Sequence, residues 1–202
     1  RLDTVKNHTG GAGADTLTSG AGADTFVYTA GTEGGDTITD FTTGTNIIQF
    51  EATVDGSTNP DVFADDDELV FANTDLTGNV ASGDVTALNA TDYNEISNTG
   101  TIAADKVNVV TDSTGYASVE AAFDSIDGSD GGTGTTVDNA DLFLGFWNSD
   151  DSEFQVHYVS DSGTSASDFS DAVSEELVGL TGIADNGIAG ALSEANFAVE
   201  VA

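Results

Sequence analysis

The sequence predicts an all-β protein with minor short helices, in which a short parallel β-roll is followed by a β-rich, sandwich-like or roll-like domain. Three observations carry this prediction. The 202 residues include 24 glycines and one proline. Long stretches alternate Thr, Val, Ile and Phe with polar residues, and a nine-residue motif recurs near the N-terminus. Alternating segments separated by glycine-rich turns are typical of β-proteins.

The charge of the chain restricts its partners. Three basic residues stand against 36 acidic ones, for a formal net charge of −33. This much like charge repels itself in a compact state unless salt screens it or cations neutralise it. We expect no binding to nucleic acid or to an anionic membrane surface, because both need Lys and Arg. A halophilic or marine surface explains most of the acids, but it does not explain acids at a fixed spacing.

The chain contains no cysteine, which excludes disulfides and thiolate metal sites. A secreted protein of this size needs another stabilising link, and we expect calcium to supply it. No apolar run approaches the roughly eighteen residues of a transmembrane span. The chain opens with Arg1, holds no Met and shows no signal peptide. We therefore expect a piece of a longer chain, with its export information upstream or at the C-terminus.

Residues 10–27 hold two consecutive nonamers, GGAGADTLT and SGAGADTFV. Both match the repeat G-G-x-G-x-D-x-U-x, with Ser19 in place of the first glycine of the second copy. A degenerate third copy follows at 28–36. The large apolar residues of the eighth position, Leu17 and Phe26, are expected to point into a narrow core. The acids at the sixth position are Asp15, Asp24 and Glu33.

This repeat has a direct physical interpretation. Six residues form a turn and three form a strand, so two nonamers make one coil, and glycine permits the positive φ angles that aim carbonyls inward. Calcium takes six to eight oxygen ligands, which turn carbonyls and one carboxylate per turn supply between stacked coils. We expect Asp15 to face Glu33 across one ion. Asp24 would need a partner at Thr42 or a substitute such as Asp36.

The segment 10–50 resembles the RTX repeats and the closing segment that follows them in serralysin-type proteases, S-layer-like proteins and other type I secreted proteins. The ending DTFVY…GGDTITDF…GT-I-F resembles the cap of that roll. The resemblance implies a secreted, calcium-dependent roll, with an Asp of the family's cap replaced here by Asn46. The metal ligands that it implies are Gly10, Gly11, Gly13, Asp15, Gly20, Gly22, Asp24, Glu33 and Asp36.

We predict two domains, a roll with its cap over residues 1–50 and a β-rich assembly domain over 51–202. The chain's last residues, LSEANFAVEVA, are read as a type I secretion signal, as a final strand, or as both. Helices are expected over 116–126 and through Phe169, Val173 and Leu177. Strands are expected at 46–52, 67–73 and 105–110, with a hairpin formed by 141–147 and 153–159.

Nothing in the sequence indicates an enzyme. The two histidines, His8 and His157, are far apart, and neither H-E-x-x-H nor G-x-S-x-G occurs. We expect His157 to be solvent-exposed on the polar face of its strand. The run Asp65 to Glu68 is either a solvated loop or a second ion site, and Trp147 is expected in the core or in an interface.

The sequence therefore predicts an extracellular calcium-binding structural protein, such as an S-layer, sheath or filament subunit. It would fold and self-assemble into homo-oligomers or polymers through its β-rich surfaces when it binds calcium after secretion. The alternative is the non-catalytic RTX tail of a larger secreted hydrolase or adhesin.

Overall fold

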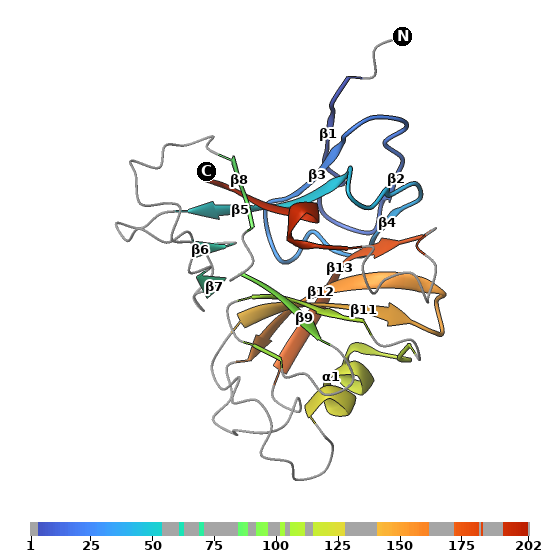
Figure 1. Ribbon diagram of the computed structural model, residues 1–202, viewed down its shortest axis with the longest axis vertical. Coiled ribbons are helices and arrows are strands. Elements are labelled where there is room, and N and C mark those ends of the chain that lie inside the picture. Colours follow the sequence, from blue (N-terminus) through green and yellow to red (C-terminus); the bar gives the residue numbers. More distant parts are fainter. Residues whose placement is uncertain are drawn as a thin grey trace.

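The computed structural model is dominated by strands, which form two seven-stranded sheets within the described residues (Figure 1). The all-β class is confirmed. No described helix is long and apolar enough to cross a membrane. The structure describes residues 4–53, 61–62, 69–70, 85–88, 92–96, 102–103, 106–111, 115–127, 141–161, 172–181, 183 and 192–201.

Both sheets begin in the N-terminal region and continue into the rest of the chain. The first has the order β1–β3–β5–β14–β8, with β6 on β5 and β7 on β6. Its strands are β1 (Asn7–His8), β3 (Thr25–Tyr28), β5 (Ile47–Thr53), β6 (Asp61–Val62), β7 (Leu69–Val70), β8 (Val85–Ala87) and β14 (Phe197–Val201). The second sheet has the order β2–β4–β13–β12–β11–β10–β9. Its strands are β2 (Thr16–Leu17), β4 (Asp36–Ile38), β9 (Tyr93–Ile96), β10 (Val107–Val110), β11 (Asp141–Asn148), β12 (Glu153–Asp161) and β13 (Ala172–Leu180).

The predicted parallel roll is formed by the first strands of the two sheets. β1, β3 and β5 stack in parallel on one side, and β2 and β4 stack in parallel on the other. The register pairs Asn7 with Thr25, which is the expected step of 18 residues. On the opposite side, however, Thr16 pairs with Thr37, a step of 21 residues. The uniform step expected from the nonamers is therefore wrong beyond the first pair of strands, because the third, degenerate repeat contains extra turn residues.

The roll merges directly into the broader β-structure. β4 pairs in parallel with β13, where Asp36 lies opposite Val178, and β5 pairs in parallel with β14, where Ile48 lies opposite Phe197. The roll strands lie at one end of the molecule and α1 (Val119–Asp127) lies at the other (Figure 1). The C-terminal segment thus forms an internal strand, since β14 lies between β5 and β8.

Within the described part of the chain, two hydrophobic cores hold these layers together. The larger one lies between the sheets and contains Phe26, with Leu17 packed at its margin, as predicted. Within it, Phe50 of the first sheet stacks on Phe143 of the second, with ring centroids 4.0 Å apart. The smaller core lies between the second sheet and α1, and includes Leu144 and Phe123. Because β11 is covered on both faces, its sequence is almost continuously apolar rather than alternating.

Several predicted elements are present. β11 and β12 form the expected antiparallel hairpin, and α1 occupies the expected helical segment. Trp147 is partly buried against the larger core. β5 and β10 match predicted strands, whereas only Leu69–Val70 of the predicted strand 67–73 is described. Phe169 and the run Asp65 to Glu68 lie outside the described residues.

Two further predictions were wrong. Val173 and Leu177 lie in β13, not in a helix. The register between β13 and β12 shifts at Leu177. The pair His157–Glu176 is followed directly by the pair Val156–Val178, so Leu177 lies opposite no residue of β12. His157 is buried, with 8% of its surface exposed, and stacks on Phe146. Its side chain lies on the face of the sheet that α1 covers, and burial lowers its pKa to about 4.

Candidate functional site

The glycines of the two matched repeats adopt the backbone conformation that the motif predicts. The second and fourth positions have positive φ in both copies, a region that glycine adopts without a steric penalty. The angles are 84° at Gly11, 98° at Gly13, 86° at Gly20 and 128° at Gly22. The two turns are therefore built alike, and each precedes a sixth-position aspartate.

The turn of the first repeat lies over the side chain of Asp36, at the start of β4. Asp36 is fully buried, and its Oδ1 accepts a hydrogen bond of 2.9 Å from the main-chain N–H of Asp15. The other oxygen, Oδ2, is buried and has no hydrogen-bond partner in the part of the chain that the structure describes. A Cβ atom on Gly10 would lie 2.3 Å from that oxygen, so only glycine permits this approach of the turn. An unsatisfied carboxylate oxygen thus faces the turn.

The electrostatic surroundings of Asp36 are unfavourable for its negative charge. Desolvation raises the pKa of Asp36, the N–H of Asp15 and the nearby hydroxyl of Tyr28 oppose this effect, and the charges of Asp15 and Glu33 add to it. Burial and the charge of Asp36 also raise the pKa of Tyr28, which lies on β3. A cation beside Asp36 would relieve this repulsion.

Glu33 does not face Asp15, contrary to the prediction from the nonamer spacing. Its carboxylate accepts two hydrogen bonds of 2.7 Å from the N–H and the hydroxyl of Thr29, and it thereby closes its own turn. The stacked partner of Asp15 is Asp36, because the step between β2 and β4 is 21 residues and not 18. Glu33 remains close enough to influence the charge of Asp36.

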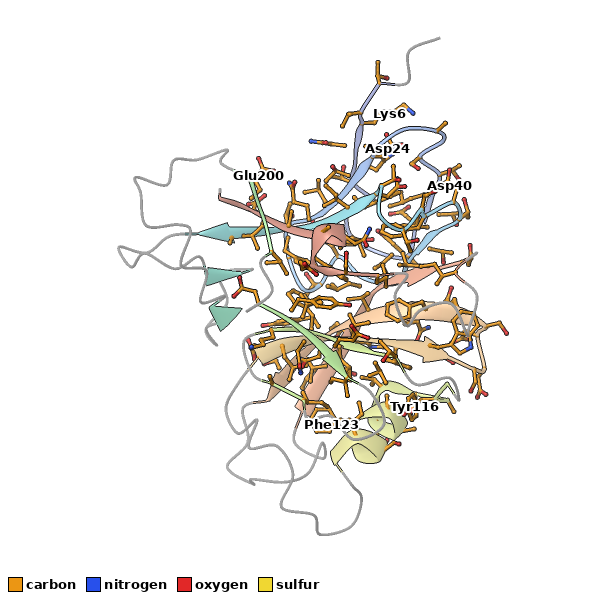
Figure 2. The ribbon with its side chains drawn as sticks, in the orientation of Figure 1. Lys6, Asp24, Asp40, Tyr116, Phe123 and Glu200 are labelled. Carbon is orange, nitrogen blue, oxygen red and sulfur yellow. The ribbon has the colours of Figure 1, made fainter. Side chains whose placement is uncertain are left out.

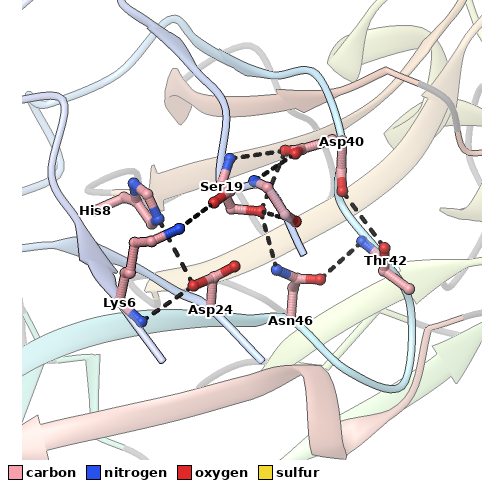
Figure 3. Close-up of polar contacts among 8 residues, drawn as sticks. Lys6, His8, Ser19, Asp24, Asp40, Thr42 and Asn46 are labelled. Atoms are coloured by element: carbon pink, nitrogen blue, oxygen red, sulfur yellow. Dashed lines mark hydrogen bonds and ion pairs between the residues drawn. The ribbon is translucent and has the colours of Figure 1, made fainter. Parts of the chain in front are cut away.

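The second sixth-position aspartate, Asp24, lies on the other side of the roll (Figure 3). It is fully buried, and its Oδ1 accepts a 3.0 Å hydrogen bond from the N–H of Lys6. Its Oδ2 has no hydrogen-bond partner among the residues described. The Nε2 of His8 lies 3.9 Å from Oδ1. The register pairs Thr25 with Ile47, so Asn46 lies one coil after Asp24. The sequence predicts Thr42 or Asp36 in that place, and this prediction is wrong.

Asp40 is a further polar residue of the roll that the sequence analysis missed. It accepts hydrogen bonds from the N–H groups of Ser19 and Gly20, at 2.9 and 2.7 Å. Desolvation opposes ionisation, but these bonds prevail and lower the pKa of Asp40. Asp40 lies 21 residues after Ser19, outside the nonamer register. The signal that could have found it is the second aspartate of GGDTITDF, the segment that closes the roll.

The donor set at Asp36 fits calcium. Among the described residues, no three His, Asp or Glu side chains converge closely enough to hold a metal ion by themselves. A calcium site here therefore needs main-chain carbonyls of the glycine turn in addition to the Asp36 carboxylate, and calcium accepts such mixed oxygen ligands. The buried, unpartnered Oδ2 of Asp36 is the observation that supports the fit.

Comparison with known proteins identifies the family. A family model described as peptidase M10 serralysin C terminal matches residues 2–112, which include the whole roll. No curated protein and no solved structure matches the chain. The matched region is the RTX calcium-binding repeat region of type I secreted proteins, and the serralysin C-terminal domain is a non-catalytic module. Because the match covers more than half of the chain, this protein belongs to the serralysin C-terminal family.

Proposed function

We propose that the chain binds calcium between the turn of the first repeat and Asp36, and that this ion completes the roll after secretion. One observation carries the proposal: Asp36 Oδ2 is buried, has no hydrogen-bond partner among the described residues, and lies against Gly10. Burying a carboxylate oxygen without a partner is costly, and a bound cation removes that penalty. The carbonyls of the turn would supply the remaining protein ligands.

Secretion offers a functional reason for the concentration of negative charge at Asp36. Asp15 and Glu33 add their negative charge to that of the buried Asp36, and this mutual repulsion disfavours the ordered roll when calcium is scarce. A chain exported from a calcium-poor cytosol would keep the turn of the first repeat loose until it meets extracellular calcium. Binding to the folded form alone would then stabilise the roll by mass action.

Calorimetric titration tests the calcium site. The wild-type chain should bind calcium, and Asp36→Asn should lose one ion or lower its affinity by more than tenfold. Glu120→Gln, at an exposed position of α1, is the control and should leave binding unchanged. Binding by Asp36→Asn that equals the wild type would place the ion elsewhere.

At a finer level, we propose an extracellular structural subunit, in which residues 1–50 form the calcium roll and residues 51–202 supply the assembly surface. A charge of −33 opposes self-association unless cations offset it. An apolar surface for contact is available, because Val173 is 63% exposed and lines a hollow together with Tyr158 and, from the roll, Ala30.

The second candidate function is the tail of a larger secreted hydrolase or adhesin. It is favoured by the edges of the roll, since among the described strands β1 and β2 each end the order of their sheet and could pair with a further coil. Electron microscopy and light scattering across a calcium titration separate the two candidates. Ordered oligomers that chelation dissolves support the structural subunit, whereas uniform monomers at millimolar calcium support the tail.

A further inference from the structure

Two columns of stacked residues in the roll differ in charge. On the side of β1, β3 and β5, the register stacks Lys6, Asp24 and Asn46, because Asn7 pairs with Thr25 and Thr25 pairs with Ile47. On the side of β2 and β4, Asp15 stacks with Asp36. The formal charges of Lys6 and Asp24 cancel in the first column, whereas both members of the second column are acidic. Both Asp24 and Asp36 bury an Oδ2 without a hydrogen-bond partner among the described residues, so the two sides differ in the charge around the carboxylate and not in that oxygen.

The ammonium group of Lys6 lies over the turn of the second repeat (Figures 2 and 3). Figure 2 places Lys6 near Asp24 at the roll end of the molecule, and Figure 3 shows its Nζ donating a hydrogen bond to the main-chain carbonyl of Ser19, the first residue of that repeat. The length of this bond is 2.7 Å. A Cβ atom on Gly20 would lie 3.7 Å from the same nitrogen. The main-chain N–H of Lys6 meanwhile binds Asp24 Oδ1. One residue thus supplies a positive group to a turn carbonyl and a donor to the buried carboxylate.

The charged groups around the turn of the second repeat match its polarity, with a carboxylate at its N–H groups and an ammonium at its carbonyl. The N–H groups of Ser19 and Gly20 point to Asp40, a carboxylate, while the carbonyl of Ser19 points to the ammonium of Lys6. The imidazole of His8 lies 3.9 Å from Asp24 and adds a second basic group on this side. The carbonyl of Ser19 in this turn therefore already contacts a cation, and that cation is a side chain of the protein itself, the ammonium group of Lys6.

We propose that the ammonium of Lys6 takes the place of a divalent cation on the Asp24 side of the roll. The inference rests on the calcium-binding role proposed above. It implies that the roll binds one ion fewer than its two matched repeats would suggest. Asp24, Gly20 and Gly22 keep the sequence and backbone of a calcium turn, but Lys6 supplies the charge. Because the Lys6 side chain is exposed, its hydrogen bond contributes little to stability, and the number of bound ions is the informative readout.

The test replaces the built-in cation with an oxygen ligand. Calcium is counted by calorimetry and native mass spectrometry for the wild type, Lys6→Asp, Lys6→Asn and Lys6→Met. Lys6→Asp should bind one ion more than the wild type, because it places a second carboxylate over Asp24. Lys6→Asn, which adds an oxygen without charge repulsion, should bind the same extra ion more weakly. Lys6→Met, which has no oxygen, should bind the wild-type number.

The outcomes for the two proposals are separable. Equal ion numbers for the wild type and a folded Lys6→Asp overturn the inference. If circular dichroism shows that Lys6→Asp does not fold even in excess calcium, Lys6→Asn decides, and the wild-type number for that variant overturns the inference. Failure of the calcium role itself would appear instead in the wild type, as an absence of binding or as indifference to Asp36→Asn.

Discussion

The main-chain N–H of Asp15 donates a hydrogen bond of 2.9 Å to Oδ1 of Asp36, across 21 residues of chain. This bond links the turn of the first repeat to the strand that closes the roll. It also leaves Oδ2 of the same carboxylate buried without a partner. The order of the first turn should therefore depend on how the charge of Asp36 is neutralised.

Asp15 should matter less for calcium binding than Asp36. The side chain of Asp15 is exposed, whereas Asp36 is fully buried. Asp15→Ala keeps the main-chain N–H that holds Asp36, so we expect its calcium affinity to fall by less than tenfold, which is below about 1.4 kcal/mol. Calorimetry on Asp15→Ala and Asp36→Asn in parallel checks this ranking. An Asp15 variant as impaired as the Asp36 variant would show that the exposed carboxylate is the main ligand.

Gly10→Ala should damage the site through steric contact. Its new Cβ would lie 2.3 Å from Asp36 Oδ2, so the carboxylate must move. We expect a loss of about 1–3 kcal/mol in the free energy of unfolding, together with weaker calcium binding. Gly44→Ala is the matched control, because Gly44 has a φ of 71° and open space around it. Gly44→Ala should lower stability by about 1–2 kcal/mol through backbone strain alone and leave calcium affinity intact. Equal calcium affinity in the two variants would argue against the close approach at Gly10.

Calcium binding should depend on pH in the acidic range. Desolvation raises the pKa of Asp36 in the calcium-free fold. Protonated Asp36 therefore stabilises the fold below the ordinary Asp pKa of about 4. This stabilisation is lost as the pH rises through the raised pKa of Asp36 in the folded state. Calcium must displace any proton bound there, so affinity should rise with pH over the same window. Calorimetry in buffers of different ionisation enthalpy measures the released proton. Binding with no proton release anywhere in that window would be inconsistent with Asp36 as a ligand.

A second pH effect should arise on the hairpin side of the molecule. Burial, with the charges of Glu153 and Asp151, raises the pKa of Glu176 from 4.5 to about 7. A raised carboxyl pKa stabilises the fold at low pH, so stability should fall between pH 4.5 and 7 as Glu176 ionises. At pH 8, Glu176→Gln should raise the free energy of unfolding by about 1–3 kcal/mol.

Denaturant titrations at several pH values check the effect of Glu176. The control is Glu175→Gln, the exposed neighbour on the same strand, which should change stability little. The pH dependence between 4.5 and 7 should be smaller in Glu176→Gln than in the wild type. If the two variants behave alike, the burial of Glu176 does not govern this pH range.

The sequence predicts the roll because its signal is local. Glycines and aspartates at fixed positions within nine residues define each turn, and the conformations of Gly11 and Gly20 follow the motif. The hairpin and α1 were also predicted, since alternation and helical spacing are local patterns. The pairing of Asp15 with Asp36 was not predicted. It depends on the length of the degenerate third repeat, and no sequence motif fixes the number of residues there.

The remaining errors came from tertiary context. Val173 and Leu177 have a spacing of four, which fits a helix face but equally fits one face of a strand. The pairing of β13 with β12 decides between them, and that contact is invisible in the local sequence. His157 was misplaced for the same reason, since its strand alternates as expected but α1 covers the face that would otherwise be exposed.

Amide hydrogen exchange with and without calcium tests the central claim most directly. The two amides to follow are those of Asp15, bound to Asp36 Oδ1, and of Thr37, bound to the carbonyl of Asp15 at 2.8 Å. Chelation should accelerate exchange at both positions, while the amides paired between β11 and β12 stay protected. Equal protection of Asp15 and Thr37 in calcium and in chelator would contradict the account, because the turn would then be ordered without the ion.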